Sequence, residues 1–215
     1  MNRRTVLIAG ILMGISATMF GQSEKYANVM KANISQLDSA LEKGTILNLG
    51  NTFERIGDAE KTQWLPYYYA SYCIVMHSYM EQDKSKTDGL ADRAEALLTK
   101  AEALNGGENS ETCVIRSMIA SSHLMVDPQS RFMKYGQASG TQIAKAKALD
   151  PLNPRPVYLE AQGKFYTPEQ FGGGKAQAKV LFEKALAMFD TFKPATELSP
   201  SWGKVSTLFF LEQIK

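Results

Sequence analysis

The chain has 215 residues, 44% of them hydrophobic and 21% charged, which suffices for one domain with a sizeable core and excludes a disordered composition. Its formal net charge of +2 equals the contribution of Arg3 and Arg4 near the N-terminus. Without those two arginines the chain is neutral, so charge gives no support for a nucleic-acid partner or an anionic membrane surface.

Residues 1–21 have the order of a secretory signal peptide. Two arginines precede an apolar run from Val6 to Phe20, and small residues end the segment at Gly21. The run is shorter than the roughly 20 apolar residues that span a bilayer, which argues against an uncleaved anchor. We therefore expect cleavage near Gly21, a periplasmic or secreted location without membrane insertion, and one domain over residues 22–215.

Helical spacing of apolar residues continues through the rest of the chain, and no window shows the period of two that marks a strand. The pattern predicts four helix pairs followed by a last helix. The first helices of the pairs are expected at 24–43, 63–81, 110–125 and 154–166, and the last helix at 199–215. Residues 80–89 and 126–136 are expected to be inserted loops.

A packing pattern recurs in the second helix of three pairs: a small residue, a large residue four positions later, and alanine three positions after that. The three sets are Ala94, Leu98 and Ala101; Ser139, Ile143 and Ala146; and Ala178, Phe182 and Ala185. A weaker copy in residues 49–61 has Phe53 and Ile56. Such positions share one face of a helix, where small side chains let a neighbouring helix approach closely.

This pattern resembles the second helix of a tetratricopeptide repeat (TPR), and Pro151 matches the proline that ends the repeat. The first helices lack the W-x2-L-G-x2-Y signature of that family. Residues 64–73, 171–186 and 200–203 are similar to segments of small exported TPR-like proteins of the Bacteroidota. The resemblance implies an all-α fold, a right-handed solenoid of TPR-like pairs with a C-terminal capping helix.

The glycines before Lys175 raise the question of a phosphate-binding loop. That motif needs a glycine at position 169 and a serine or threonine after the lysine, but the chain has Glu169 and Ala176 there. We therefore predict that Gly172, Gly173 and Gly174 form a turn between two antiparallel helices.

Catalytic, cofactor and metal sites find little support. His77 and His123 lack metal-ligand spacing, and Cys73 lies one turn before His77 on an apolar helix that would raise the thiol pKa. We expect no enzyme activity, no cofactor and no bound metal. Export permits a disulfide between Cys73 and Cys113, and two buried free thiols are the alternative.

The predicted function is that of a non-catalytic scaffold or adaptor that binds a protein or peptide segment in the concave groove of the solenoid. One alternative is a small-ligand-binding accessory protein of a transport system, with a closed apolar pocket. A hydrolase with an unrecognised site is the other. In the TPR-like register, with Ala70 and Ala161 as close-packing positions, the groove residues are Trp64, Tyr67, Ser71, Arg155, Tyr158 and Gln162.

Overall fold

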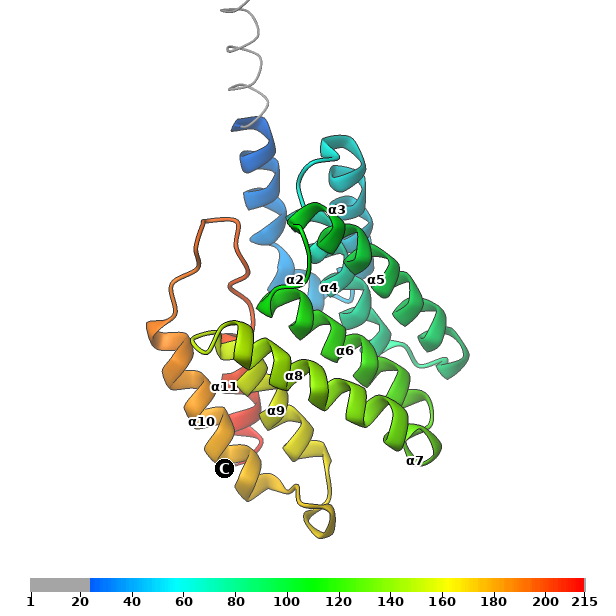
Figure 1. The fold of residues 1–215 in the computed structure, drawn as a ribbon, viewed down its shortest axis with the longest axis vertical. Helices are drawn as coiled ribbons and strands as arrows, with labels where there is room; N and C mark the ends of the chain where they lie inside the picture. The colour runs from blue at the N-terminus through cyan, green and yellow to red at the C-terminus, as the bar shows by residue number, and fades with distance from the viewer. Residues whose placement is uncertain (1–23, 215) are drawn as a thin grey trace, which may run out of the picture.

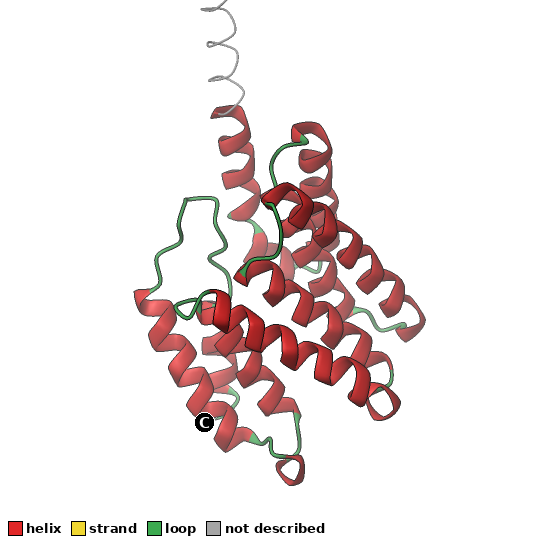
Figure 2. Cartoon of the chain, in the orientation of Figure 1, coloured by secondary structure: helices red, strands yellow, loops and turns green. Residues whose placement is uncertain are grey.

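The computed structural model describes residues 24–214, and each secondary-structure element within them is a helix (Figures 1 and 2). The predicted all-α class is therefore confirmed for this part of the chain. The signal-peptide prediction for residues 1–21 lies outside the described residues. None of the helices in residues 24–214 is long and apolar enough to span a membrane.

Residues 24–34 form the first helix described, and the other elements follow in chain order. They are α2 (Leu37–Glu42), α3 (Ile46–Glu60), α4 (Leu65–Met80), α5 (Lys84–Asn105), α6 (Ser110–Val126), α7 (Pro128–Arg131), the π-helix η1 (Phe132–Gly136), α8 (Gln137–Leu149), α9 (Pro154–Tyr166), the 3₁₀-helix η2 (Glu169–Phe171), α10 (Lys175–Thr191) and α11 (Lys204–Glu212).

The two segments predicted as inserted loops are mostly helical, so that prediction is wrong. The Asp83 side chain accepts a hydrogen bond from the Ser85 backbone N–H and starts α5 within the first segment. Asp127 accepts one from the Ser130 N–H and starts α7 in the second segment, which continues into η1. Capping aspartates at both sites extend the helices into sequence that lacks apolar periodicity.

Neighbouring helices in the chain pack on one another from α3 to α6, and then α6 packs on α8, α8 on α9, α9 on α10 and α10 on α11 (Figure 1). The repeated small and large residues lie in these contacts. Ala94, Leu98 and Ala101 are fully buried, and so are Ala178, Phe182 and Ala185. In the remaining set Ala146 is fully buried, whereas Ser139 and Ile143 are half-buried. The sequence pattern therefore identifies real helix-packing positions.

Candidate functional site

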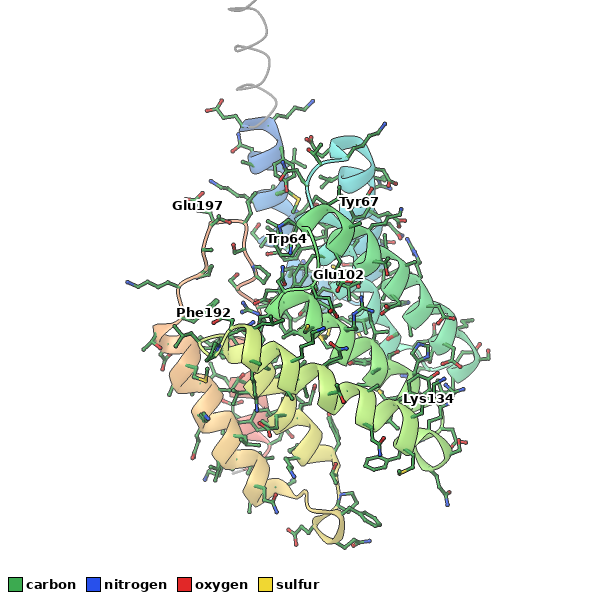
Figure 3. All side chains as sticks on the ribbon, viewed as in Figure 1. Trp64, Tyr67, Glu102, Lys134, Phe192 and Glu197 are labelled. Carbon is green, nitrogen blue, oxygen red and sulfur yellow. The ribbon has the colours of Figure 1, made fainter. Side chains whose placement is uncertain are left out.

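The six residues predicted to line a groove do not form one surface. Ser71 donates a hydrogen bond to the Ala94 carbonyl in α5, at 2.7 Å, and Tyr67 donates one to Asp58 in α3, at 2.8 Å. Both side chains thus face the neighbouring helices. Trp64 is half-buried against Tyr68 (Figure 3).

The three predicted groove residues on α9 differ from one another. Arg155 is 1% exposed and buried among polar groups, Tyr158 packs between Phe182 and Phe210, and Gln162 is half-buried. These positions therefore serve mainly as contacts within the fold.

The most polar part of the core is an ion pair between Arg155 in α9 and Glu111 in α6. The guanidinium donates from Nε to Glu111 Oε2 at 2.8 Å and from Nη2 to Oε1 at 2.7 Å. Tyr68 and Asn153 also donate to the same carboxylate. Burial alone would lower the pKa of Arg155, but the interaction with Glu111 outweighs it and raises that pKa, so the guanidinium stays charged.

This ion pair also holds the chain between α10 and α11, residues 192–203. Arg155 donates to the Pro200 carbonyl at 2.9 Å, and the Trp202 indole N–H donates to the Tyr68 hydroxyl at 2.9 Å. The Tyr69 hydroxyl donates to the Leu198 carbonyl. The segment is thus fixed against α4 and α9, with Glu197 at its outer turn (Figure 3).

The thiols and imidazoles do not form a reactive group. Cys73 and Cys113 are free and buried; burial raises the pKa of Cys73 and raises that of Cys113 to about 11. His123 lies 2.7 Å from Asp88 through Nδ1 and stacks on Tyr135, whereas His77 is half-buried on α4. Among the described residues, no group of three His, Cys, Asp or Glu side chains could hold a metal ion.

A pocket of about 300 Å³ lies at the start of α6. Its lining residues are Glu108, Asn109, Ser110, Glu111, Leu149 and Asp150. Three carboxylates among six residues make it polar and acidic, which is unlike the closed apolar pocket expected of a small-ligand carrier.

A cluster of aromatic rings joins α9 to α11. Phe210 is buried at its centre, with ring centroids of Phe165, Phe209 and Tyr166 at 5.1, 5.6 and 6.0 Å. Tyr166 is nevertheless 69% exposed and Phe209 56%. We call this surface the α9–α11 aromatic face, consisting of Phe165, Tyr166, Val205, Leu208, Phe209 and Phe210.

Helix α11 exposes apolar side chains because it has two apolar sides. Thr207 and Phe210 are buried against the body, whereas Val205, Leu208 and Phe209 repeat at helical spacing on the solvent side. The sequence predicts an amphipathic capping helix here, and a polar outer side would be usual. The prediction overlooked that Val205, Leu208 and Phe209 are also apolar and recur at helical spacing on the solvent side of α11.

The direction of α11 depends on Gly203, its N-cap. This residue has φ of 112°, a left-handed conformation that favours glycine. A Cβ atom there would also lie 2.6 Å from Cζ of Phe189. Gly203 thus lets the chain turn tightly after Trp202 and bring Phe210 onto α9 and α10.

Two lysines lie beside the α9–α11 aromatic face. The Nζ atom of Lys175 is 5.7 Å from the centre of the Phe165 ring and donates to the Gln213 carbonyl. Lys164 is in the last turn of α9 and donates to the Gly172 carbonyl at 2.6 Å. An exposed apolar surface with cations at its edge fits a flat apolar ligand that carries acidic groups.

A comparison with known proteins points to a binding protein. No family model and no curated protein sequence matches the chain. A solved structure, the HusA haemophore from Porphyromonas gingivalis, matches with 38% sequence identity and a TM-score of 0.76, over 88% of this chain and 92% of that chain. Its source is a member of the Bacteroidota, as the sequence resemblance implied.

This match overturns the predicted adaptor function. HusA is described as a haemophore, which is a carrier of a small molecule, so the expectation of a protein or peptide partner in a concave groove is wrong. The small-ligand alternative agrees with the match. At this identity and coverage, the chain belongs to the same family as the HusA haemophore.

Proposed function

We propose that this protein is a non-catalytic carrier of haem or a related porphyrin and that it binds the ring on the α9–α11 aromatic face. The exposure of Tyr166 and Phe209 on one aromatic cluster is the observation that carries this proposal. The family relationship to a haemophore supplies the ligand class.

The chemistry of the surface suits this ligand. A porphyrin is a flat apolar ring with propionate groups at its edge, and aromatic side chains bind flat rings by stacking and edge contacts. Phe209, Tyr166 and Leu208 offer apolar contact area, Lys175 offers positive charge beside the Phe165 ring, and Lys164 lies in the last turn of α9. Attraction between the propionate groups and Lys175, the first residue of α10, favours a porphyrin bound with its propionates toward α10.

The finer architectural predictions belong to the same proposal. The serial packing of the helices and the burial of the repeated alanines support a right-handed solenoid of TPR-like pairs with α11 as its cap. Export through residues 1–21 fits a carrier that collects its ligand outside the cytoplasm and passes it to a transport system.

Titration of the purified protein with ferric haem and with metal-free protoporphyrin tests the proposal. Quenching of tryptophan fluorescence and the porphyrin absorption band report binding. We expect saturable binding by the wild type and a clear loss of affinity in Phe209→Ser. Phe132→Ser is the matched control, because Phe132 is 55% exposed but lies on η1. No binding by the wild type, or an equal loss in both variants, would contradict the proposal.

A further inference from the structure

The segment that joins α10 to α11, residues 192–203, contacts helices that are distant from it in the chain (Figure 1). The Tyr69 hydroxyl donates a hydrogen bond to the Leu198 carbonyl at 2.9 Å across 129 positions of the sequence. The Trp202 indole N–H donates one to the Tyr68 hydroxyl at 2.9 Å across 134 positions. We call this segment the strap, because it ties the C-terminal part of the helix array to α4.

The inner end of the strap is fastened by buried groups. The Trp202 ring stacks on Tyr72, with centroids 4.5 Å apart and an interplanar angle of 27°. The Arg155 guanidinium donates to the Pro200 carbonyl at 2.9 Å and lies 4.9 Å from the centre of the Phe192 ring. Because Trp202, Tyr72 and Arg155 are almost fully buried, these contacts are lost only when the strap leaves α4 and α9.

The outer turn of the strap is exposed by contrast. Residues 193–197 lie in solvent, and the Ser199 N–H donates to the Thr196 carbonyl at 3.1 Å to close the turn. Glu197 forms an ion pair with Lys31 of the first helix, but both side chains are exposed, and such pairs contribute little to stability (Figure 3). The strap is therefore held mainly by its inner end.

The strap differs from the other contacts of the helix array in its range along the chain. The most extensive helix–helix contacts join elements that are close in chain order, such as α3 with α4 and α9 with α10. In an array held by neighbour contacts alone, one end can unfold while the rest stays folded. We infer that the strap is a clasp that couples the two ends of the array, so that α9, α10 and α11 unfold only together with α4.

The clasp also fixes α11, which starts directly after the strap at Lys204. Movement of α11 away from α9 and α10 would pull on Trp202, which is held by Tyr68 and Tyr72. The exposed apolar side of α11 therefore keeps its position relative to α9. Coupling of the two ends does not depend on which ligand the chain binds.

Native-state hydrogen exchange tests the clasp. Exchange is followed by mass spectrometry at low urea concentrations, and the amides of α3 and α4 are compared with those of α9, α10 and α11. We expect the slowest amides of both groups to share one opening equilibrium in the wild type. Trp202→Leu removes the ring stack and the hydrogen bond to Tyr68, so α9, α10 and α11 should open at least about tenfold more often than α3 and α4.

Val180→Ala is the matched control, because Val180 is 66% exposed on α10 and its change should leave the two groups of amides together. Tyr69→Phe is a milder variant that serves if Trp202→Leu does not fold. It keeps the ring stacked on Phe53, with centroids 5.1 Å apart, and removes only the bond to Leu198. It should raise the opening of α9, α10 and α11 over that of α3 and α4 by about two- to fivefold.

Two results would overturn the clasp. In the first, α9, α10 and α11 open more readily than α3 and α4 already in the wild type. In the second, Trp202→Leu and Tyr69→Phe increase the opening of both groups equally or of neither. Equal increases would mean that the strap contributes to stability without coupling the two ends.

Discussion

Helix α4 and the α9–α11 aromatic face are both rich in aromatic side chains, but they differ in exposure. Tyr68 and Tyr69 of α4 are fully buried and Tyr72 is 3% exposed, whereas Tyr166 and Phe209 are more than half exposed. Aromatic residues stabilise cores as readily as they bind ligands. The difference teaches that accessibility, and not local enrichment, separates a binding surface from a packing surface in this chain.

The hydroxyl groups of the α4 tyrosines support the same division between a packing surface and a binding surface. On α4 they join helices together: Tyr68 reaches Glu111 in α6, Tyr79 reaches the Met118 carbonyl, and Tyr69 reaches Leu198 in the segment after α10. A buried polar group without a partner is costly, so these contacts are required for stability.

The first prediction concerns the ion pair beneath α4. Arg155→Met leaves the Glu111 carboxylate buried without its partner, and breaking such a pair costs about 3–5 kcal/mol. Urea denaturation should show this loss in the free energy of unfolding. A double variant, Arg155→Met with Glu111→Leu, should recover much of the loss, because it removes both charges. A loss below about 1 kcal/mol in the single variant would contradict a structural role for the pair.

A smaller loss is expected for Tyr68→Phe. The change removes the hydroxyl group that accepts a hydrogen bond from the Trp202 indole N–H and donates one to Glu111. A buried polar group left without a partner costs about 1–3 kcal/mol. Thermal unfolding should report this loss, while porphyrin affinity should stay at the wild-type value. A large fall in affinity with unchanged stability would place the ligand on α4 instead.

Phe209→Ser is expected to lower porphyrin affinity and to leave stability nearly unchanged, which is the reverse of Tyr68→Phe. Burying a phenylalanine under a ligand contributes about 1.5 kcal/mol or more, so affinity should fall about tenfold. The free energy of unfolding should change by no more than about 0.5 kcal/mol, because the side chain is largely exposed. Parallel losses of stability and affinity would remove the distinction between the two regions.

The smallest effect concerns acid stability where Asp88 of α5 meets Arg131 of α7. Hydrogen bonds from Arg131 lower the pKa of Asp88 to about 2, against a usual value of about 3.9. A lowered pKa in the folded state means that this stabilisation is present above about pH 4 and is lost as the pH falls toward 2. Because Asp88 is partly exposed, the total should stay below about 1 kcal/mol.

Asp88→Asn tests that effect. The variant should show a flatter dependence of unfolding free energy on pH between 4 and 2 than the wild type, and equal porphyrin affinity at neutral pH. An identical acid dependence in both proteins would exclude Asp88 as its source.

Much of the fold could be predicted from local sequence. Helix α9 is predicted over residues 154–166 and observed over Pro154–Tyr166, because Asn153 caps it and two prolines suit its first turn. The buried alanines near Leu98 and Phe182 follow from helical spacing in the same way.

The candidate site could not be predicted in this way. Whether an α4 side chain is covered depends on residues 192–203, and the contact of Tyr69 with Leu198 spans 129 positions in the chain. The exposed side of α11 depends on the turn at Gly203 and on packing against α9. Such long-range contacts leave no local signature, so the predicted groove included Arg155, a buried residue, and omitted Phe209.

The most direct test of the proposed site is an amide chemical-shift map of the protein titrated with metal-free protoporphyrin. We expect the largest shifts on residues 165–166 and 205–210 and no change in residues 132–136 of η1. Largest shifts on η1 or along α4, with residues 205–210 unaffected, would contradict it.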